Sequence, residues 1–420
     1  MSTVTGPALP RAGADHIEPP PPARPVGQSR LPSLTGMRWV AALLVFGDHI
    51  LEDYLAPHFA VSPVVESGSW RLLKFAGPWG VTFFFILSGF VLAWSARTAD
   101  TRWAFWGRRL AKIYPNHLVT MAAAVVLALI VGIQITPGQL LTHLTLTQAW
   151  LPNSGVLFSL NGLSWSLCAE LFFYLSFPFI LPYLRLLSVR QLRIAVVVLP
   201  VVVIGFQFAI MAVEDPAFMS WLTYFWPLPR IFEFVIGMAL ALLTKAGAWR
   251  GPSLRQAVAL LCAAMLAGMF LPAPLGRAPA VIVPIMLLLP VAALADVAGT
   301  RTVWAHPRMV YLGEVSFAFY MVHLLVIRAC HEAGLFPERV TAVWMVIGPV
   351  VMFVFSFIAA LALYHGVEKP MMRLLSPRGR PGRHLAAQPA WWGSRPALVL
   401  SVMGVAVLAT VPVVAVVFAG

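Results

Sequence analysis

Apolar segments of about twenty residues alternate with short polar connections along almost the whole chain. A segment of this length and hydropathy is long enough to cross a bilayer as a helix. The segment 311–330 is the most polar of them, and we keep it because the charges of its neighbouring connections require a crossing there. The pattern predicts eleven transmembrane helices, at about 35–56, 78–96, 117–135, 163–184, 193–213, 222–244, 255–273, 279–296, 311–330, 342–365 and 396–418.

Composition supports a polytopic membrane protein of the all-α class. The chain has 420 residues, of which 60% are hydrophobic and only 11% are charged, and no soluble domain of this length has so little charged surface. The net charge of +13 does not indicate a nucleic-acid partner, because the basic residues are spread between the hydrophobic segments. Cys168, Cys262 and Cys330 lie within apolar segments and are interpreted as small core residues.

The basic residues also predict the topology. With the N-terminus in the cytoplasm, Lys and Arg concentrate in every alternate connection, as the positive-inside rule requires. Residues 1–30 are predicted to be a disordered, proline-rich cytoplasmic tail, and they lack the features of a cleaved signal peptide. Residues 31–370 form a ten-helix membrane domain, 371–395 a basic cytoplasmic linker, and 396–420 an additional transmembrane helix. No internal repeat is apparent, which argues against a transporter built from repeated halves.

Two ionisable residues on the first predicted helix are the leading candidates for chemistry. Arg38 and His49 are eleven residues apart, so they share one helical face about 16 Å apart along the axis. Ionisable residues inside a membrane are costly and usually face a cavity or a partner. The alternative is that Arg38 reaches the lipid headgroups and His49 is a satisfied interface histidine.

The next two segments offer a ligand site at the cytoplasmic side. Arg109 and Lys112 are one helical turn apart in a predicted loop, with Pro115 near the start of the following helix. Such a pair suits a phosphate-rich ligand such as the pyrophosphate of coenzyme A, although lipid headgroups are an alternative. The Ser88-Gly89 pair indicates either close helix packing or a backbone approach to a ligand.

A polar stripe follows on the fourth predicted helix, where Ser166, Glu170 and Tyr174 recur at a spacing of four. Glu170 near the outer end can orient His49 as a general base, or it can form a structural ion pair with an arginine.

Further polar residues occur on the later helices. Arg230 and Glu233, after a proline-broken entry, either pair with each other or mark irregular backbone around a cavity. Ser316, Tyr320 and His323 share a face, and Glu368 with Lys369 predicts a salt bridge at a helix terminus. No helix has paired metal-ligand spacing, so we expect no metal site.

Together these segments resemble the integral-membrane acyltransferases called acyltransferase family 3. The resemblance runs in order from Leu31 to Pro370, through LTGMRWVAALLVFGDH, FFFILSGFVLA, RRLAKIYP, SWSLCAELFFYLSFPF, FEFVIGMALA, LGEVSFAFYMVHLLV and VEKP. The usual Arg-x-x-Arg pair is Arg109 and Lys112 here, which keeps the charge but loses one bidentate fork. The family's members acylate hydroxyls of bacterial glycans and macrolides.

The resemblance implies an acyl-CoA co-substrate, no permanently bound cofactor, a hydroxylated glycan or natural-product acceptor, and a bacterial plasma membrane. Its implied catalytic residues are Arg38, His49 and Glu170. We expect His49, oriented by Glu170 or Asp48, to take the proton of an acceptor hydroxyl that attacks the thioester. A covalent acyl-enzyme on Ser88 or Ser166 is the alternative. A transporter and a structural or sensory membrane protein remain rival classes. We assign Arg109, Lys112, Ser88 and Tyr114 to the donor, and Trp165, Ser166, Tyr174, Arg230, Glu233, Tyr320 and His323 to the substrate.

Overall fold

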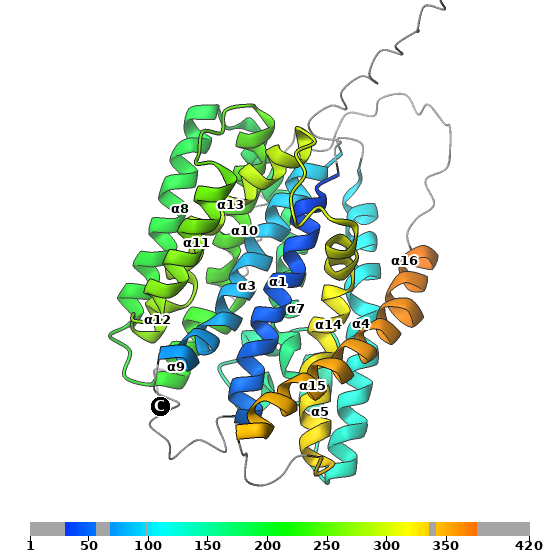
Figure 1. Cartoon of the computed structure of the whole chain (residues 1–420). Coiled ribbons are helices and arrows are strands. Elements are labelled where there is room, and N and C mark those ends of the chain that lie inside the picture. Colours follow the sequence, from blue (N-terminus) through cyan, green and yellow to red (C-terminus); the bar gives the residue numbers. More distant parts are fainter. Residues whose placement is uncertain (1–29, 56–67, 98–99, 336–341, 376–420) are drawn as a thin grey trace, which may run out of the picture.

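The fold is an all-α bundle, as the sequence predicts (Figure 1). The computed structural model describes residues 30–55, 68–97, 100–335 and 342–375, and no strand occurs among them. Helices α1, α3 and α7 lie in the middle of the view, with α8, α11 and α13 on one side and α4, α14 and α15 on the other (Figure 1).

Ten of the predicted helices fall within the described residues, and each corresponds to an observed helix. They are α1 (Pro32–His49), α3 (Gly68–Ser95), α4 (Arg102–Val131), α7 (Trp165–Leu186), α8 (Val189–Ile210), α10 (Pro227–Lys245), α11 (Leu254–Gly268), α13 (Ala278–Val297), α14 (Pro307–Glu332) and α15 (Ala342–Leu363). Within the described part of the chain, nine helices are long and apolar enough to cross a membrane, whereas α11 has only 15 residues. The predicted helix 396–418 lies outside the described residues, as do most of the predicted tail and linker.

Shorter elements connect these helices. They are the π-helices η2 (Ile50–Leu55), η5 (Trp221–Phe225) and η6 (Tyr364–Glu368), the 3-10 helices η3 (Gln148–Trp150) and η4 (Gly162–Ser164), and the short α-helices α5 (Pro137–Thr145), α6 (Ser154–Leu157), α9 (Pro216–Ser220), α12 (Ala273–Gly276) and α16 (Lys369–Leu375). The start of the predicted linker is therefore helical, since α16 extends to Leu375.

One boundary differs from the prediction in a way that matters for the site. Helix α4 begins at Arg102, so Arg109 and Lys112 lie within its first half and not in a loop. Pro115 is inside this helix, which tolerates it as membrane helices do when neighbouring groups satisfy the freed backbone. The predicted break before α10 is confirmed, because Trp226 is extended and Pro227 opens the helix.

The bundle is centred on α1, α3, α10 and α14, which pack closely through glycines. A Cβ atom on Gly89 would lie 1.9 Å from the carbonyl oxygen of Phe234, and one on Gly237 would lie 1.9 Å from that of Ile86. Helices α3 and α10 therefore touch backbone to backbone. Of the two interpretations of Gly89, close helix packing is confirmed.

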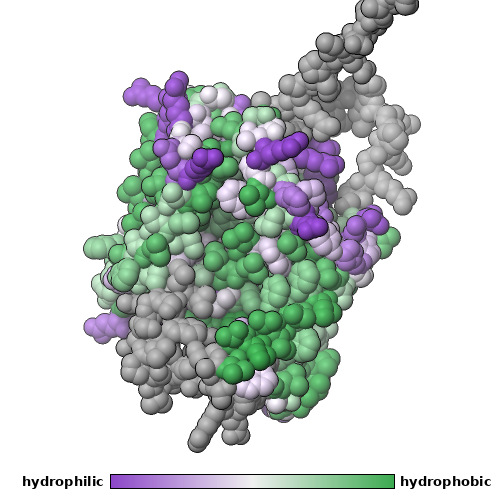
Figure 2. All heavy atoms as spheres, in the orientation of Figure 1, coloured by the Kyte–Doolittle hydropathy of each residue, from purple (hydrophilic) through white to green (hydrophobic). Residues whose placement is uncertain are grey.

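The outer helices present apolar side chains to their surroundings. Val197 and Val201 on α8 are 65% and 63% exposed, and Val346 on α15 is 67% exposed. Figure 2 shows hydrophobic surface along the body of the molecule and hydrophilic residues gathered at the end where α1 begins. This distribution fits a bundle whose sides face lipid.

A polar cluster closes the opposite end. The buried His143 ring contacts the hydroxyls of Ser159 and Ser164 at 3.0 and 3.2 Å, and its Nε2 lies 2.9 Å from the carbonyl oxygen of Val156. Burial lowers the pKa of His143, so the neutral ring is favoured in the folded protein. The cluster fixes the connection that leads into α7.

Candidate active site

The first of two adjoining cavities lies among α1, α3, α4, α7 and α14 and has a volume of about 120 Å³. We call it the cationic cavity, because Arg38, Arg109 and Lys112 line it. Glu170 supplies a carboxylate, and Ser88, Ser166, Tyr174 and Ser316 supply hydroxyls. The remaining lining is mostly apolar, with Val81, Phe84, Phe85, Leu87, Val91, Leu92, Leu167, Phe317 and Tyr320. An elongated ligand with one charged end and one apolar end fits such a lining.

Glu170, the carboxylate of this cavity, interacts with the cations and not with His49. Glu170 accepts a hydrogen bond from the Tyr174 hydroxyl one turn further along α7. The Arg109 guanidinium lies 6.0 Å from the centre of the same tyrosine ring, and Lys112 interacts electrostatically with Glu170. The predicted pairing of Glu170 with His49 is therefore wrong, because the two residues lie in different cavities.

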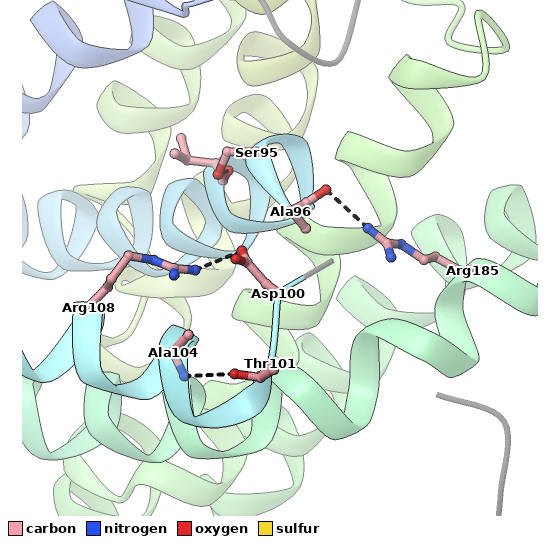
Figure 3. A network of polar contacts seen from close by, with 8 residues as sticks. Ser95, Ala96, Asp100, Thr101, Ala104, Arg108 and Arg185 are labelled. Carbon is pink, nitrogen blue, oxygen red and sulfur yellow. Dashed lines mark hydrogen bonds and ion pairs between the residues drawn. The ribbon is translucent and has the colours of Figure 1, made fainter. Parts of the chain in front are cut away.

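Neighbouring basic residues have partners of their own (Figure 3). Arg108 forms an ion pair with Asp100 at 2.7 Å, and the Arg185 guanidinium donates to the carbonyl oxygen of Ala96 at 3.3 Å. The Thr101 hydroxyl caps α4 by accepting from the backbone N–H of Ala104. Arg109 and Lys112 thus line the cationic cavity, whereas the arginine that precedes them does not.

A buried carboxylate that we did not assign to the site lies beside these cations. Glu368, in η6, accepts a hydrogen bond of 2.8 Å from the amide of Asn116 and interacts electrostatically with Lys112 and Arg38. The predicted salt bridge of Glu368 with Lys369 is wrong. The π-helical turn leaves Glu368 buried, while the Lys369 ammonium lies 6.0 Å from the ring centre of Tyr364.

The second cavity lies towards the opposite end of the bundle and has a volume of about 350 Å³. We call it the histidine cavity, because His49 lines it together with Trp165 and Tyr224. Two carboxylates and three cations also line it, namely Asp48, Glu52, Lys74, Arg277 and Arg328. Arg277 and Arg328 are not among the site residues that we predicted from the sequence. The spacing of Tyr320, Leu324 and Arg328, four residues apart on one face, was the signal available for Arg328.

Hydrogen bonds determine the tautomer of His49. Its Nδ1 lies 2.8 Å from the carbonyl oxygen of Val45, and a carbonyl only accepts, so Nδ1 carries the proton. In the neutral ring, Nε2 therefore has a free lone pair. An imidazole in this tautomer can take a proton from a bound hydroxyl group.

The two cavities meet at Tyr320 and Val81, which line both of them. The Tyr320 hydroxyl contacts the Ser166 hydroxyl at 2.7 Å, and its ring lies 6.0 Å from the ring of His323. Tyr320 thus separates the cationic groups from His49.

Four of the predicted site residues lie outside both linings. Arg230 and Glu233 are each 1% exposed and pair with each other at 2.7 Å, and the Arg230 guanidinium lies 4.9 Å from the ring centre of Phe85. They form an ion pair within α10, which confirms the mutual pairing that the sequence left open as one alternative, and they line neither of the two cavities. Tyr114 donates to the carbonyl oxygen of Leu144, and His323 is completely buried; neither lines one of the two cavities.

The chain is similar to known acyltransferases over most of its length. An acyltransferase domain family model matches residues 31–364. The chain is 39% identical over 367 residues to "Acyltransferase MdmB" of Streptomyces mycarofaciens, covering 83% of this chain and 93% of that protein. It is 29% identical over 324 residues to "Exopolysaccharide production protein ExoZ" of Rhizobium meliloti (strain 1021), covering 73% of this chain and 92% of that protein. No solved structure gives a significant match.

These matches decide among the three classes that the sequence left open. The family model that spans most of the chain describes a family of enzymes, and not of transporters or sensors. The membrane-spanning helices place the enzyme in a bilayer with several crossings. The chain belongs to acyltransferase family 3 and is a multi-pass membrane O-acyltransferase.

Proposed function

We propose that the protein moves a short acyl group, acetyl or propionyl, from acyl-CoA to a hydroxyl of a carbohydrate or of a glycosylated natural product such as a macrolide. The observation that supports this most directly is the pair of adjoining cavities, one lined by three cations and one containing His49. A two-substrate reaction requires two binding regions that meet at the reacting atoms.

The cationic cavity suits the donor. Arg38, Arg109 and Lys112 offer charge-assisted hydrogen bonds to the phosphates of coenzyme A. The Nε atom of Arg109 is buried and has no hydrogen-bond partner in the described part of the chain, as is suitable for binding an anion. The apolar lining beyond the cations suits the pantetheine arm and the acyl chain, which end near Tyr320.

His49 is the proposed general base. Its Nε2 takes the proton of the acceptor hydroxyl, whose oxygen forms a bond with the thioester carbon. The carbon–sulfur bond then breaks, and the coenzyme A thiolate takes the proton back from His49. The products are an ester and free coenzyme A. The proposal includes no permanently bound cofactor.

The proposed location is the bacterial plasma membrane, with the end where α1 begins facing the cytoplasm. Acyl-CoA is a cytoplasmic metabolite, so the cationic cavity must be reachable from that side. The similarity to a protein of exopolysaccharide production favours a second candidate acceptor, a cell-surface polysaccharide.

Thiol release tests the proposal. The purified protein is mixed with acetyl-CoA or propionyl-CoA and with a panel of acceptors that includes a macrolide, simple glycosides and an exopolysaccharide fragment. We expect release that depends on an acceptor and that His49→Ala abolishes. If neither donor gives thiol release with any acceptor, although the protein still melts cooperatively, the proposal is contradicted. The best acceptor in the panel distinguishes the two candidate classes.

A further inference from the structure

We propose that His323 is a positioning residue, which holds the His49 ring in its basic tautomer and stabilises the protonated ring during acyl transfer. The inference rests on the proposed function, since it concerns how His49 performs its role there. It replaces the sequence-based assignment of His323 to the substrate.

The first observation is that His323 cannot touch a substrate in this structure. Its side chain is 0% exposed, and it lines neither cavity. Its ring stacks on Phe319, with centroids 5.6 Å apart, and meets the ring edges of Phe46 and Tyr320. Any effect of His323 on chemistry must therefore act through a neighbour.

The second observation is that its tautomer is determined. Nδ1 of His323 lies 3.1 Å from the carbonyl oxygen of Phe319, so this nitrogen carries the proton. In the neutral ring, the lone pair is then on Nε2. A completely buried ring among aromatic side chains stays neutral, because an isolated charge there is costly.

The third observation joins the two histidines. Nε2 of His323 lies 3.4 Å from Nδ1 of His49, which already donates to Val45, and the ring centroids are 5.2 Å apart. The proton on His49 Nδ1 therefore faces two acceptors, the Val45 carbonyl and the His323 lone pair. Moving the proton to Nε2 of His49 would leave both acceptors without a donor and remove the lone pair from Nε2.

The same contact strengthens during the reaction. When His49 takes the hydroxyl proton, its ring becomes cationic, and the Nδ1–H donates a charge-assisted hydrogen bond to His323. Other charged groups also face His49. Asp48 and Glu52 come from its own segment, and Lys74, Arg277 and Arg328 come from the other elements around the cavity. His323 differs from these five in that its Nε2 is shown in contact with a ring nitrogen of His49, at 3.4 Å.

Two substitutions at His323 test the inference with the full-length protein in detergent. His323→Phe keeps an aromatic ring but removes the acceptor, and His323→Gln retains a carbonyl oxygen as acceptor. We expect the Phe variant to lose roughly 10- to 100-fold in kcat with the KM of both substrates unchanged, by analogy with the partners that orient metal-ligating histidines. We expect the Gln variant to recover a large part of this loss.

Three outcomes would overturn the inference. They are a kcat of the Phe variant within twofold of the wild type, a raised KM with unchanged kcat, and a Gln variant as slow as the Phe variant. If the Phe variant does not melt cooperatively, His323→Leu is judged by the same criteria. If the wild-type protein itself releases no thiol, the proposed function is refuted. This outcome differs from a failure of the inference about His323, in which the wild type is active. In labelled wild-type protein, the nitrogen NMR shifts of His49 are expected to show the proton on Nδ1 alone.

Discussion

At the scale of single residues, two adjacent arginines on α4 have different surroundings although their chemistry is the same. Arg108 is paired with Asp100, whereas Arg109 lines the cationic cavity beside Tyr174. A difference of one residue turns a helical side chain by 100°, which is enough to move it from the cavity to the surface. This pair offers a variant and a matched control within one turn.

We expect Arg109→Ala to raise the KM for acyl-CoA roughly tenfold, while kcat changes little, because the side chain binds donor phosphate in ground state and transition state alike. Arg108→Ala is the control and is expected to leave both constants near the wild-type values. Steady-state thiol release measures both. An acyl-pantetheine donor, which lacks the nucleotide phosphates, should not distinguish the variant from the wild type. A tenfold difference with that donor would show that Arg109 does not act on phosphate.

Tyr320 is the second residue with a specific expected role, since it lines both cavities. Removing its ring with Tyr320→Ala joins the two spaces, so water from the histidine cavity can reach the donor thioester. We expect acceptor-independent thiol release to rise severalfold relative to acceptor-dependent transfer. Tyr320→Phe keeps the ring and should keep the ratio low. Equal ratios in the two variants would mean that the ring does not separate the substrates.

At the scale of elements, the contact between α3 and α10 depends on glycine at two positions. We expect Gly237→Ala to lower stability, because the new Cβ atom would lie 1.9 Å from the Ile86 carbonyl oxygen. Overpacking of this kind typically costs about 1–3 kcal/mol. Gly205→Ala on α8 is the control, since a Cβ atom there has nothing within 4 Å. Alanine is favoured over glycine in a helix by up to about 1 kcal/mol, so the control should melt at or above the wild-type temperature.

Thermal melting in detergent, followed by intrinsic tryptophan fluorescence, compares these two variants. A melting temperature of Gly237→Ala equal to that of the control would mean that α3 and α10 separate without cost. Helix α3 carries Ser88 into the cationic cavity and Lys74 into the histidine cavity, so a looser contact is also expected to lower transfer activity.

At the scale of the whole molecule, the two cavities lie towards opposite ends of the bundle. The polar contacts between Ser33 and Asp296, and between Lys245 and the Trp94 carbonyl, place the start of α1 and the ends of α3, α10 and α13 at one end. The cationic cavity lies towards that end. If the donor is acyl-CoA, we therefore expect the end where α1 begins to face the cytoplasm.

Cysteine labelling tests this orientation. We expect Glu214→Cys to react with a membrane-impermeant maleimide in intact cells, and Arg301→Cys to react only after lysis, in a Cys262→Ser background. Both positions are exposed, and they lie on connections at opposite ends of the bundle. The reverse labelling would place the cationic cavity on the outer side and contradict a cytoplasmic donor.

The sequence by itself determined the class, the ten described helices and the family, because hydropathy and the order of motifs are local properties of the chain. It also singled out Arg38 and His49 as candidates, since they are ionisable residues within an apolar segment. Helical periodicity placed Ser166, Glu170 and Tyr174 on one face, but it could not say which neighbouring helix that face meets.

Only the tertiary structure decided the partners of those residues. Glu170 lies with Arg109 and Lys112, Glu368 joins them from η6, and His323 lies behind His49. These contacts depend on how each helix is rotated and which helices are its neighbours. Rotation and neighbour order are set by the summed packing of many side chains, including the glycine contacts of α3 with α10, and no single segment contains that information.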